Sequence, residues 1–361
     1  MVWQRMPPLR ILALRQEVIK LRQHPQQEGG IHGRIVVYPE FLKKGDTVGI
    51  CALSAGTGDK LDELEESLSV LHSEGYLTKE TKSVRSKKKR SASAKTRAGE
   101  LDELVKDDEV KMIILATGGD VQMETVPFID YDSSAKHPKW IMGLSDPTNL
   151  LFPVTTMLDI ATLYGFNGAS FTIEHGKDQE YDLSYLKGDL VTQKSFSRYQ
   201  TFLDAINENN VTHKVEWQAK EDMKIHGRCI GGCLDVIEKL IGTEYDHVND
   251  FIDRYRDDGI VWYFDNFAMS AYNTYLTLLQ FRMTGYFRYC KGILIGRTAF
   301  PSTAGSDVIF DYESAYKLAL KDIPYITEMD IGHTRPRMTM INGALIDVTY
   351  KNHKGTVKFH L

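Results

Sequence analysis

The first half of the chain alternates short apolar runs with amphipathic segments. Residues 47–53, 111–117 and 140–144 are dense in apolar side chains, which is typical of strands buried on both faces. A helical pattern follows the first run as far as residue 74, and another spans residues 97–104. Alternating strands and helices predict a parallel sheet with helices on both faces, so we expect an α/β domain here.

A second compact half begins near residue 226 with a different pattern. We predict a helix over 226–240, a strand over 260–264, a helix over 272–283 and a strand over 292–295, followed by short strands to the C-terminus. This order predicts a second α/β domain that is rich in short strands.

The polar stretches divide the chain into four parts, and a length of 361 residues favours two domains over one. We expect an N-terminal extension over 1–34, an α/β domain over 35–175, a linker and substrate-facing loop over 176–225, and a second domain over 226–361.

Composition narrows the possible environments and partners. The net charge of −5 gives no bulk attraction to nucleic acid or to anionic lipid, and no apolar run approaches the length of a membrane span. Four cysteines without a CxxC pair indicate free thiols in a reducing compartment. We therefore expect a cytoplasmic protein that binds neither nucleic acid nor membrane, and no residue spacing suggests a metal site.

Three loops carry candidate chemistry. Ser145 and Asp146 follow the strand over 140–144, at a turn into a helix, where a serine hydroxyl would be exposed beside free backbone N–H groups. Helix capping is the commoner role for such a serine. The pair Gly118-Gly119 ends a neighbouring strand, either as a site for a developing oxyanion or as a mere tight turn. His333 is a candidate base because it follows a glycine on a loop.

Six blocks of sequence together make one interpretation specific. They are Pro39–Ile50, Ser91–Leu101, Gly118–Asp120, Gly143–Asp146, Gly227–Gly232 and Ile331–His333. In this order they resemble the LD-carboxypeptidase family of serine peptidases, which includes microcin C immunity peptidases. The resemblance covers about residues 39–350, and it implies a flavodoxin-like first domain.

The resemblance also implies catalytic roles. Ser145 matches the nucleophile, His333 matches the base, and the backbone N–H groups of Gly119 and Asp146 match the oxyanion hole. The acid matches Asp265, where the family usually has glutamate. This side chain is one methylene shorter, and a misplacement of about 1 Å can cost roughly 100-fold in rate.

Further expectations follow from the same resemblance. Substrate contacts fall on Gly118, Asp120, Asn167 and Tyr199. The immunity branch has a tryptophan in the mid-chain loop, for which this chain offers only Tyr199 or Phe196. The family needs neither metal nor cofactor, and its members suggest a homodimer.

Two functions from different classes remain open at this point. The first is hydrolysis of an amide next to a free carboxylate, in a murein L,D-peptide or in a microcin C-like peptidyl-nucleotide. The second is a catalytically impaired homologue that binds peptides or nucleotide conjugates, because the acid is shortened and the tryptophan is absent.

Overall fold

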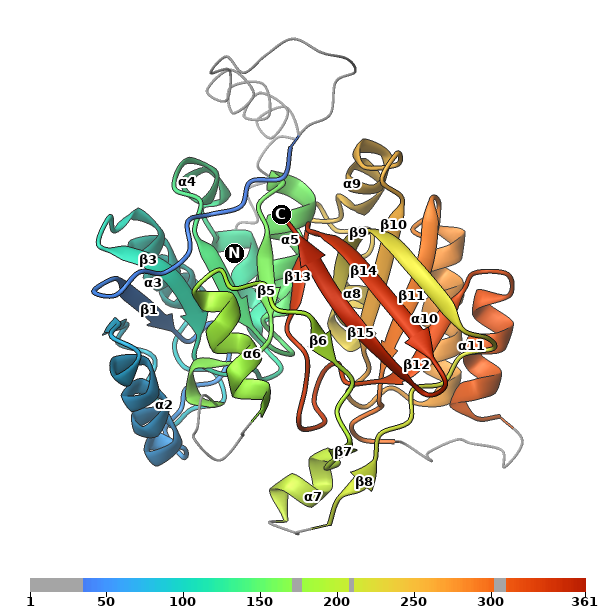
Figure 1. Cartoon of the computed structure of the whole chain (residues 1–361). Coiled ribbons are helices and arrows are strands. Elements are labelled where there is room, and N and C mark those ends of the chain that lie inside the picture. The colour runs from blue at the N-terminus through green and yellow to red at the C-terminus, as the bar shows by residue number, and fades with distance from the viewer. Residues whose placement is uncertain (1–34, 171–176, 208–210, 302–309) are drawn as a thin grey trace.

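The computed structural model describes residues 35–170, 177–207, 211–301 and 310–361. Two large sheets lie beside each other, with helices packed around them and between them, whereas no described helix lies in front of β14 and β15 (Figure 1). The predicted N-terminal extension lies outside the described residues. The expected mixed α/β fold is confirmed.

The first sheet has six strands in the order β13-β5-β4-β3-β1-β2, and β13 alone is antiparallel to its neighbour. The strands are β1 (Thr47–Cys51), β2 (Leu77–Glu80), β3 (Val110–Leu115), β4 (Trp140–Gly143), β5 (Thr162–Tyr164) and β13 (Met340–Asn342). The three apolar runs predicted as strands are therefore strands of one parallel sheet. The C-terminal part of the chain also contributes a strand to it.

The helices of this half are α2 (Leu61–Ser73), α3 (Ala94–Lys106), α4 (Tyr131–Lys136), α5 (Thr148–Leu158) and the 3₁₀ turns η1 (Gln122–Phe128) and η2 (Gly168–Ser170). Ser93 begins α3 by accepting a hydrogen bond from the N–H of Thr96. Nearly every side chain of α5 is buried, because this helix packs between the two sheets against α8, α9 and β9 (Figure 1). Within the described ranges, no helix combines the length and apolar character that crossing a bilayer requires.

The second sheet has seven strands in the order β12-β11-β10-β9-β14-β15-β6. The strands are β6 (Gln193–Lys194), β9 (Met223–Cys233), β10 (Ile260–Asp265), β11 (Cys290–Gly296), β12 (Tyr325–Met329), β14 (Leu345–Lys351) and β15 (Lys354–His360), and the helices around them are α8 (Leu234–Leu240), α9 (Val248–Arg254), α10 (Ala271–Met283) and α11 (Tyr312–Leu320). Strands β9 to β12 are parallel, whereas β14, β15 and β6 are antiparallel.

The predicted helix over 226–240 is wrong in its first half. Residues up to Cys233 form the central strand β9, and the helix α8 begins only at Leu234. The glycines of this segment interrupt the apolar pattern of a strand, but they allow the neighbouring strand to pack closely. A Cβ atom on Gly231 would lie 1.9 Å from the carbonyl oxygen of Tyr263 on β10.

The segment between the two halves is more structured than the expected linker. It contains α6 (Lys177–Leu186), β7 (Arg198–Tyr199), α7 (Phe202–Ile206) and β8 (His213–Lys214). We call the described residues 195–207 and 211–218 the arm, whose elements β7, α7 and β8 project from the body in Figure 1. The backbone of Gln200 pairs with that of Arg335, at 2.7 and 3.1 Å, so the arm is joined to the loop that carries His333.

Candidate active site

The loops that end β1, β3 and β4 meet at the carboxyl edge of the first sheet, as predicted for parallel strands. These three strands are neighbours in the order β4-β3-β1. A Cβ atom on Gly118 would lie 3.2 Å from the Cβ of Ser145 and 3.6 Å from its Oγ. The glycine turn after β3 therefore packs directly on the serine after β4.

Ser145 sits on a strained turn. Its φ angle is +75°, a left-handed conformation that serine seldom adopts and that clusters at functional sites. The turn is tight, because a Cβ atom on Gly143 would lie 2.5 Å from the ring of Pro147. The side chain of Ser145 stays half-buried while its neighbours on both sides are buried. The strand-to-helix turn thus presents this hydroxyl at the sheet edge.

Two backbone N–H groups beside Ser145 are available to a ligand. Across the described residues, the N–H groups of Gly119 and Asp146 donate no hydrogen bond. Gly119 is exposed, has a φ angle of +142°, and leaves no room for a side chain, because a Cβ atom would lie 2.4 Å from Ser54 Oγ. Free N–H groups at such a turn can stabilise a negatively charged oxygen.

The side chain of Asp146 connects the loops at this edge of the sheet by hydrogen bonds. Its buried carboxylate accepts hydrogen bonds from Ser54 Oγ (2.5 Å), the N–H of Gln122 (2.9 Å) and Asn149 Nδ2 (2.7 Å). Burial raises the pKa of Asp146 above its ordinary value. Because these partners follow β1, β3 and β4, the carboxylate holds the serine turn and the glycine turn in one arrangement.

His333 and Asp265 lie together above this edge. Asp265 is the last residue of β10 and is fully buried, and its Oδ2 lies 2.8 Å from His333 Nδ1. The distance is that of a hydrogen bond, but the ring N–H is not aligned with the oxygen. Catalytic hydrogen bonds often align only when substrate binds. The shorter acid therefore reaches the imidazole.

Gly332 explains how the histidine loop comes so close to a short acid. Its φ angle is +96°, and a Cβ atom at this position would lie 2.0 Å from Asp265 Oδ1. Only glycine combines this backbone conformation with this approach.

Tyr164, at the end of β5, joins the two halves of the site. Its buried hydroxyl donates a 2.6 Å hydrogen bond to Asp265 Oδ2 and accepts one of 3.1 Å from the N–H of Ser145. Burial, followed by the charge of Asp265, raises the pKa of Tyr164 well above its ordinary value, so the phenol stays protonated and can donate. One hydroxyl group thus connects the serine turn of the first sheet with the acid of the second.

Two phenylalanines flank the imidazole of His333. The ring centre of Phe267 lies 4.5 Å from that of the imidazole, and Phe202 of α7 meets it edge-on at 5.9 Å. Phe202 and Phe267 also contact each other at 5.2 Å. Phe202 of the arm and Phe267 after β10 therefore form an aromatic wall beside the histidine.

The residues predicted to contact substrate have different surroundings. The amide of Asn167 is engaged by the backbone N–H and C=O of Leu144, at 2.9 and 3.2 Å, and so supports the serine turn. Asp120 is exposed at the glycine turn. Tyr199 lies under the guanidinium of Arg297 at 4.1 Å, whereas Phe196 is buried against Tyr181.

Several residues of the site were missed from the sequence. Phe267 had one signal, its position two residues after the acid, whereas nothing in the local pattern distinguished Phe202 or Tyr164. Cys233 is buried, and burial holds its pKa well above the ordinary value, so it is no thiolate nucleophile. The described part of the chain holds no cluster of three metal-ligating side chains.

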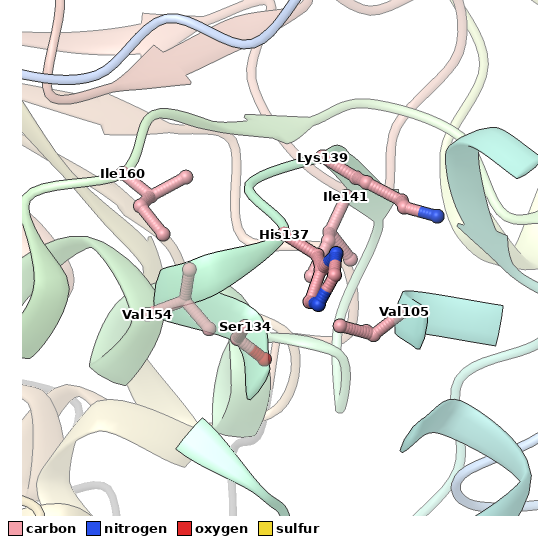
Figure 2. Close-up of a pocket in the computed structure, with 7 residues that line it drawn as sticks. All are labelled: Val105, Ser134, His137, Lys139, Ile141, Val154 and Ile160. Atoms are coloured by element: carbon pink, nitrogen blue, oxygen red, sulfur yellow. The ribbon is translucent and has the colours of Figure 1, made fainter. Parts of the chain in front are cut away.

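A narrow hollow lies at the other edge of the first sheet. Figure 2 shows its lining, which includes His137 and Lys139 just before β4 together with Val154 and Ile160. Burial lowers the pKa of Lys139 to about 8, and its amine donates to the carbonyl oxygen of Leu104 at 3.0 Å. None of the candidate active-site residues lines this hollow, because those residues lie at the carboxyl ends of the strands.

Comparisons with known proteins cover most of the chain. Family models match residues 48–165, as the LD-carboxypeptidase N-terminal domain, and 226–348, as the LD-carboxypeptidase C-terminal domain. A putative carboxypeptidase of Treponema pallidum is 28% identical, over 75% of this chain and 79% of its own length. The microcin C7 self-immunity protein MccF of Escherichia coli is 26% identical, over 86% and 92%. A probable murein peptide carboxypeptidase of Bacillus subtilis is 27% identical, over 71% and 73%.

Solved structures show the same fold. MccF in complex with aspartyl sulfamoyl adenosine superposes with a TM-score of 0.76 at 22% identity, covering 89% of this chain and 98% of that one. The muramoyltetrapeptide carboxypeptidase of Oxalobacter formigenes gives a TM-score of 0.68 at 18% identity, covering 87% and 99%.

Proposed function

The chain belongs to the LD-carboxypeptidase family of serine peptidases, and from that premise we propose that it hydrolyses an amide bond next to a free carboxylate with Ser145, His333 and Asp265. The observation that carries this proposal is the hydroxyl of Tyr164. It bonds both the N–H of Ser145 and the carboxylate that adjoins His333.

The proposed reaction needs no group outside the chain except water. His333 takes the proton of the Ser145 hydroxyl as its oxygen attacks the amide carbon, and the N–H groups of Gly119 and Asp146 stabilise the oxyanion. His333 then gives the proton to the leaving amine, and a water molecule repeats the sequence on the acyl-enzyme. Asp265 beside Nδ1 keeps the ring proton on that nitrogen, which leaves Nε2 free as the base.

The substrate is one of two classes, a murein L,D-peptide or a peptidyl-nucleotide of the microcin C kind. Relatives with either name match this chain, and the aromatic wall of Phe202 and Phe267 suits an apolar or planar group near the base. The wall favours the peptidyl-nucleotide, because a nucleobase can stack on an aromatic ring.

The test is the Ser145→Ala variant, assayed by mass spectrometry on murein tetrapeptide and on an aminoacyl-sulfamoyl adenosine. We expect no hydrolysis of either compound, with unchanged folding. Ser73→Ala is the matched control, because that hydroxyl bonds only the carbonyl oxygen of Val70 on its own helix and should leave turnover intact.

Labelling with a serine-directed fluorophosphonate provides a second readout. We expect one label per chain, located on Ser145, which would also distinguish an enzyme from a homologue that only binds. Unchanged turnover by the Ser145→Ala protein would remove this serine from the mechanism.

A further inference from the structure

Arg337 is a buried arginine without a protein counter-charge. Its side chain is 4% exposed, and its guanidinium carbon lies 4.7 Å from the ring centre of Phe166. Nε has no hydrogen-bond partner, and among the described residues no carboxylate lies within ion-pair distance of the guanidinium. The equally buried Arg97 and Arg297, by contrast, each pair with a carboxylate.

An unpaired buried cation needs an explanation. Removing a guanidinium from water is costly unless a negative group compensates it, and contact with one aromatic face offsets only part of that cost. Arginines are rarely buried in this way for packing alone. The side chain is therefore built to receive a counter-charge that the described chain does not supply.

Sheet pairing brings Arg337 toward the candidate active site. Strand β13 lies beside β5 (Figure 1) and is antiparallel to it. Met340 is opposite Tyr164 in this pairing. The residues before β13 therefore run beside the residues that follow β5, and this places Arg337 over Phe166.

Each of the two residues in this contact is close in sequence to a residue of the candidate active site. Phe166 precedes Asn167, whose amide bonds the backbone of Leu144 just before the nucleophile turn. Arg337 follows His333 by four residues on the same loop. The free guanidinium thus lies at the same sheet edge as the proposed nucleophile and base.

We propose that Arg337 binds a carboxylate of the substrate. This inference rests on the proposed function and deepens it, because it assigns the free carboxylate next to the cleaved amide to one residue. A guanidinium presents its donors in a planar fork that fits the two oxygens of a carboxylate.

The experiment compares wild type with Arg337→Met, which keeps an unbranched apolar stem but removes the guanidinium and its charge. Each protein is given murein tetrapeptide and its C-terminal carboxamide, and also glutamyl- and glutaminyl-sulfamoyl adenosine. For whichever pair is cleaved, we expect the kcat/KM of wild type to be roughly 30- to 1,000-fold higher for the compound with the free carboxylate than for its amide. Arg337→Met should lose this preference. Turnover of the neutral partner should be similar in both proteins.

Two further measurements separate the possible failures. Binding of the same compounds to Ser145→Ala proteins, with and without Arg337→Met, is measured by calorimetry and does not depend on hydrolysis. The Tm of the ligand-free Arg337→Met protein should equal or exceed that of wild type, because an unpaired charge has been removed.

The acid-to-amide ratio decides the outcome. The same ratio in wild type and in Arg337→Met, in turnover and in binding, overturns the inference and leaves the proposed function standing. Binding that shows the preference without any hydrolysis by wild type would overturn the function alone. If Arg337→Met does not fold, Arg337→Lys serves instead, because it keeps the charge but loses the fork and should weaken the preference.

Discussion

Replacing Tyr164 with phenylalanine removes one oxygen atom that connects the two halves of the candidate site. That oxygen donates to Asp265 Oδ2 at 2.6 Å and accepts the N–H of Ser145 at 3.1 Å. The ring itself is buried, so phenylalanine keeps the ring packing and vacates only the space of one oxygen atom. The variant therefore isolates the two hydrogen bonds from the packing of the side chain.

The cost of the change can be estimated from these two bonds. A hydrogen bond to a charged group contributes about 1.5–3 kcal/mol, and leaving a buried N–H without a partner costs about 1–3 kcal/mol. Ser145 is only half-buried, so water can reach part of the vacated space. We expect a loss of about 2–4 kcal/mol in the free energy of unfolding.

The expected effect of Tyr164→Phe on activity follows from the position of the hydroxyl between Ser145 and Asp265. Tyr164 is proposed to act through Ser145 and Asp265, so kcat should fall by about 10- to 100-fold while KM changes little. The assays are steady-state kinetics on the cleaved substrate and urea unfolding.

Tyr263→Phe provides the matched control. Its ring centre lies 5.7 Å from that of Tyr164, it is equally buried, and its hydroxyl makes no hydrogen bond to Ser145 or to Asp265. Its kcat should match that of wild type. Equal kcat values for the two variants, or an unchanged kcat for Tyr164→Phe, would refute the positioning role.

Two further predictions use the same structure. Gly332→Ala should lower kcat by at least about 100-fold, because a Cβ atom 2.0 Å from Asp265 Oδ1 displaces either the histidine loop or the acid by about 1 Å; a rate within tenfold of wild type would contradict this. Asp102→Asn should raise the Tm at pH 7 but not near pH 4. Burial raises the pKa of Asp102 to about 6 in the folded chain, against about 3.9 in the unfolded chain. As the pH rises between these two values, ionisation of Asp102 lowers the free energy of unfolding by at most about 3 kcal/mol. Calorimetry at both pH values checks it, and an equal Tm difference at the two would argue against the assignment.

The strands β1, β3 and β4 of the first sheet could be predicted because they are short and apolar and end at turns. Each ends one or two residues before the predicted run does, and their parallel order brings Gly118 against Ser145. The error at β9 arose because Gly227 and Gly231 break the apolar pattern of a strand. Those glycines are required by the close approach of β10, which no local pattern reveals.

The sequence by itself determined the family, the α/β class and the loops that carry Ser145 and His333, because these depend on local periodicity, turn chemistry and motif order. Only the tertiary structure decided which distant groups share one hydroxyl and which buried arginine lacks a counter-charge. Arg337 reaches Phe166 because β13 returns from the second half of the chain to pair with β5, and Tyr164 at the end of β5 reaches Asp265 at the end of β10 in the other sheet. Contacts between residues more than one hundred positions apart depend on how the two sheets are arranged and leave no signal in the local sequence.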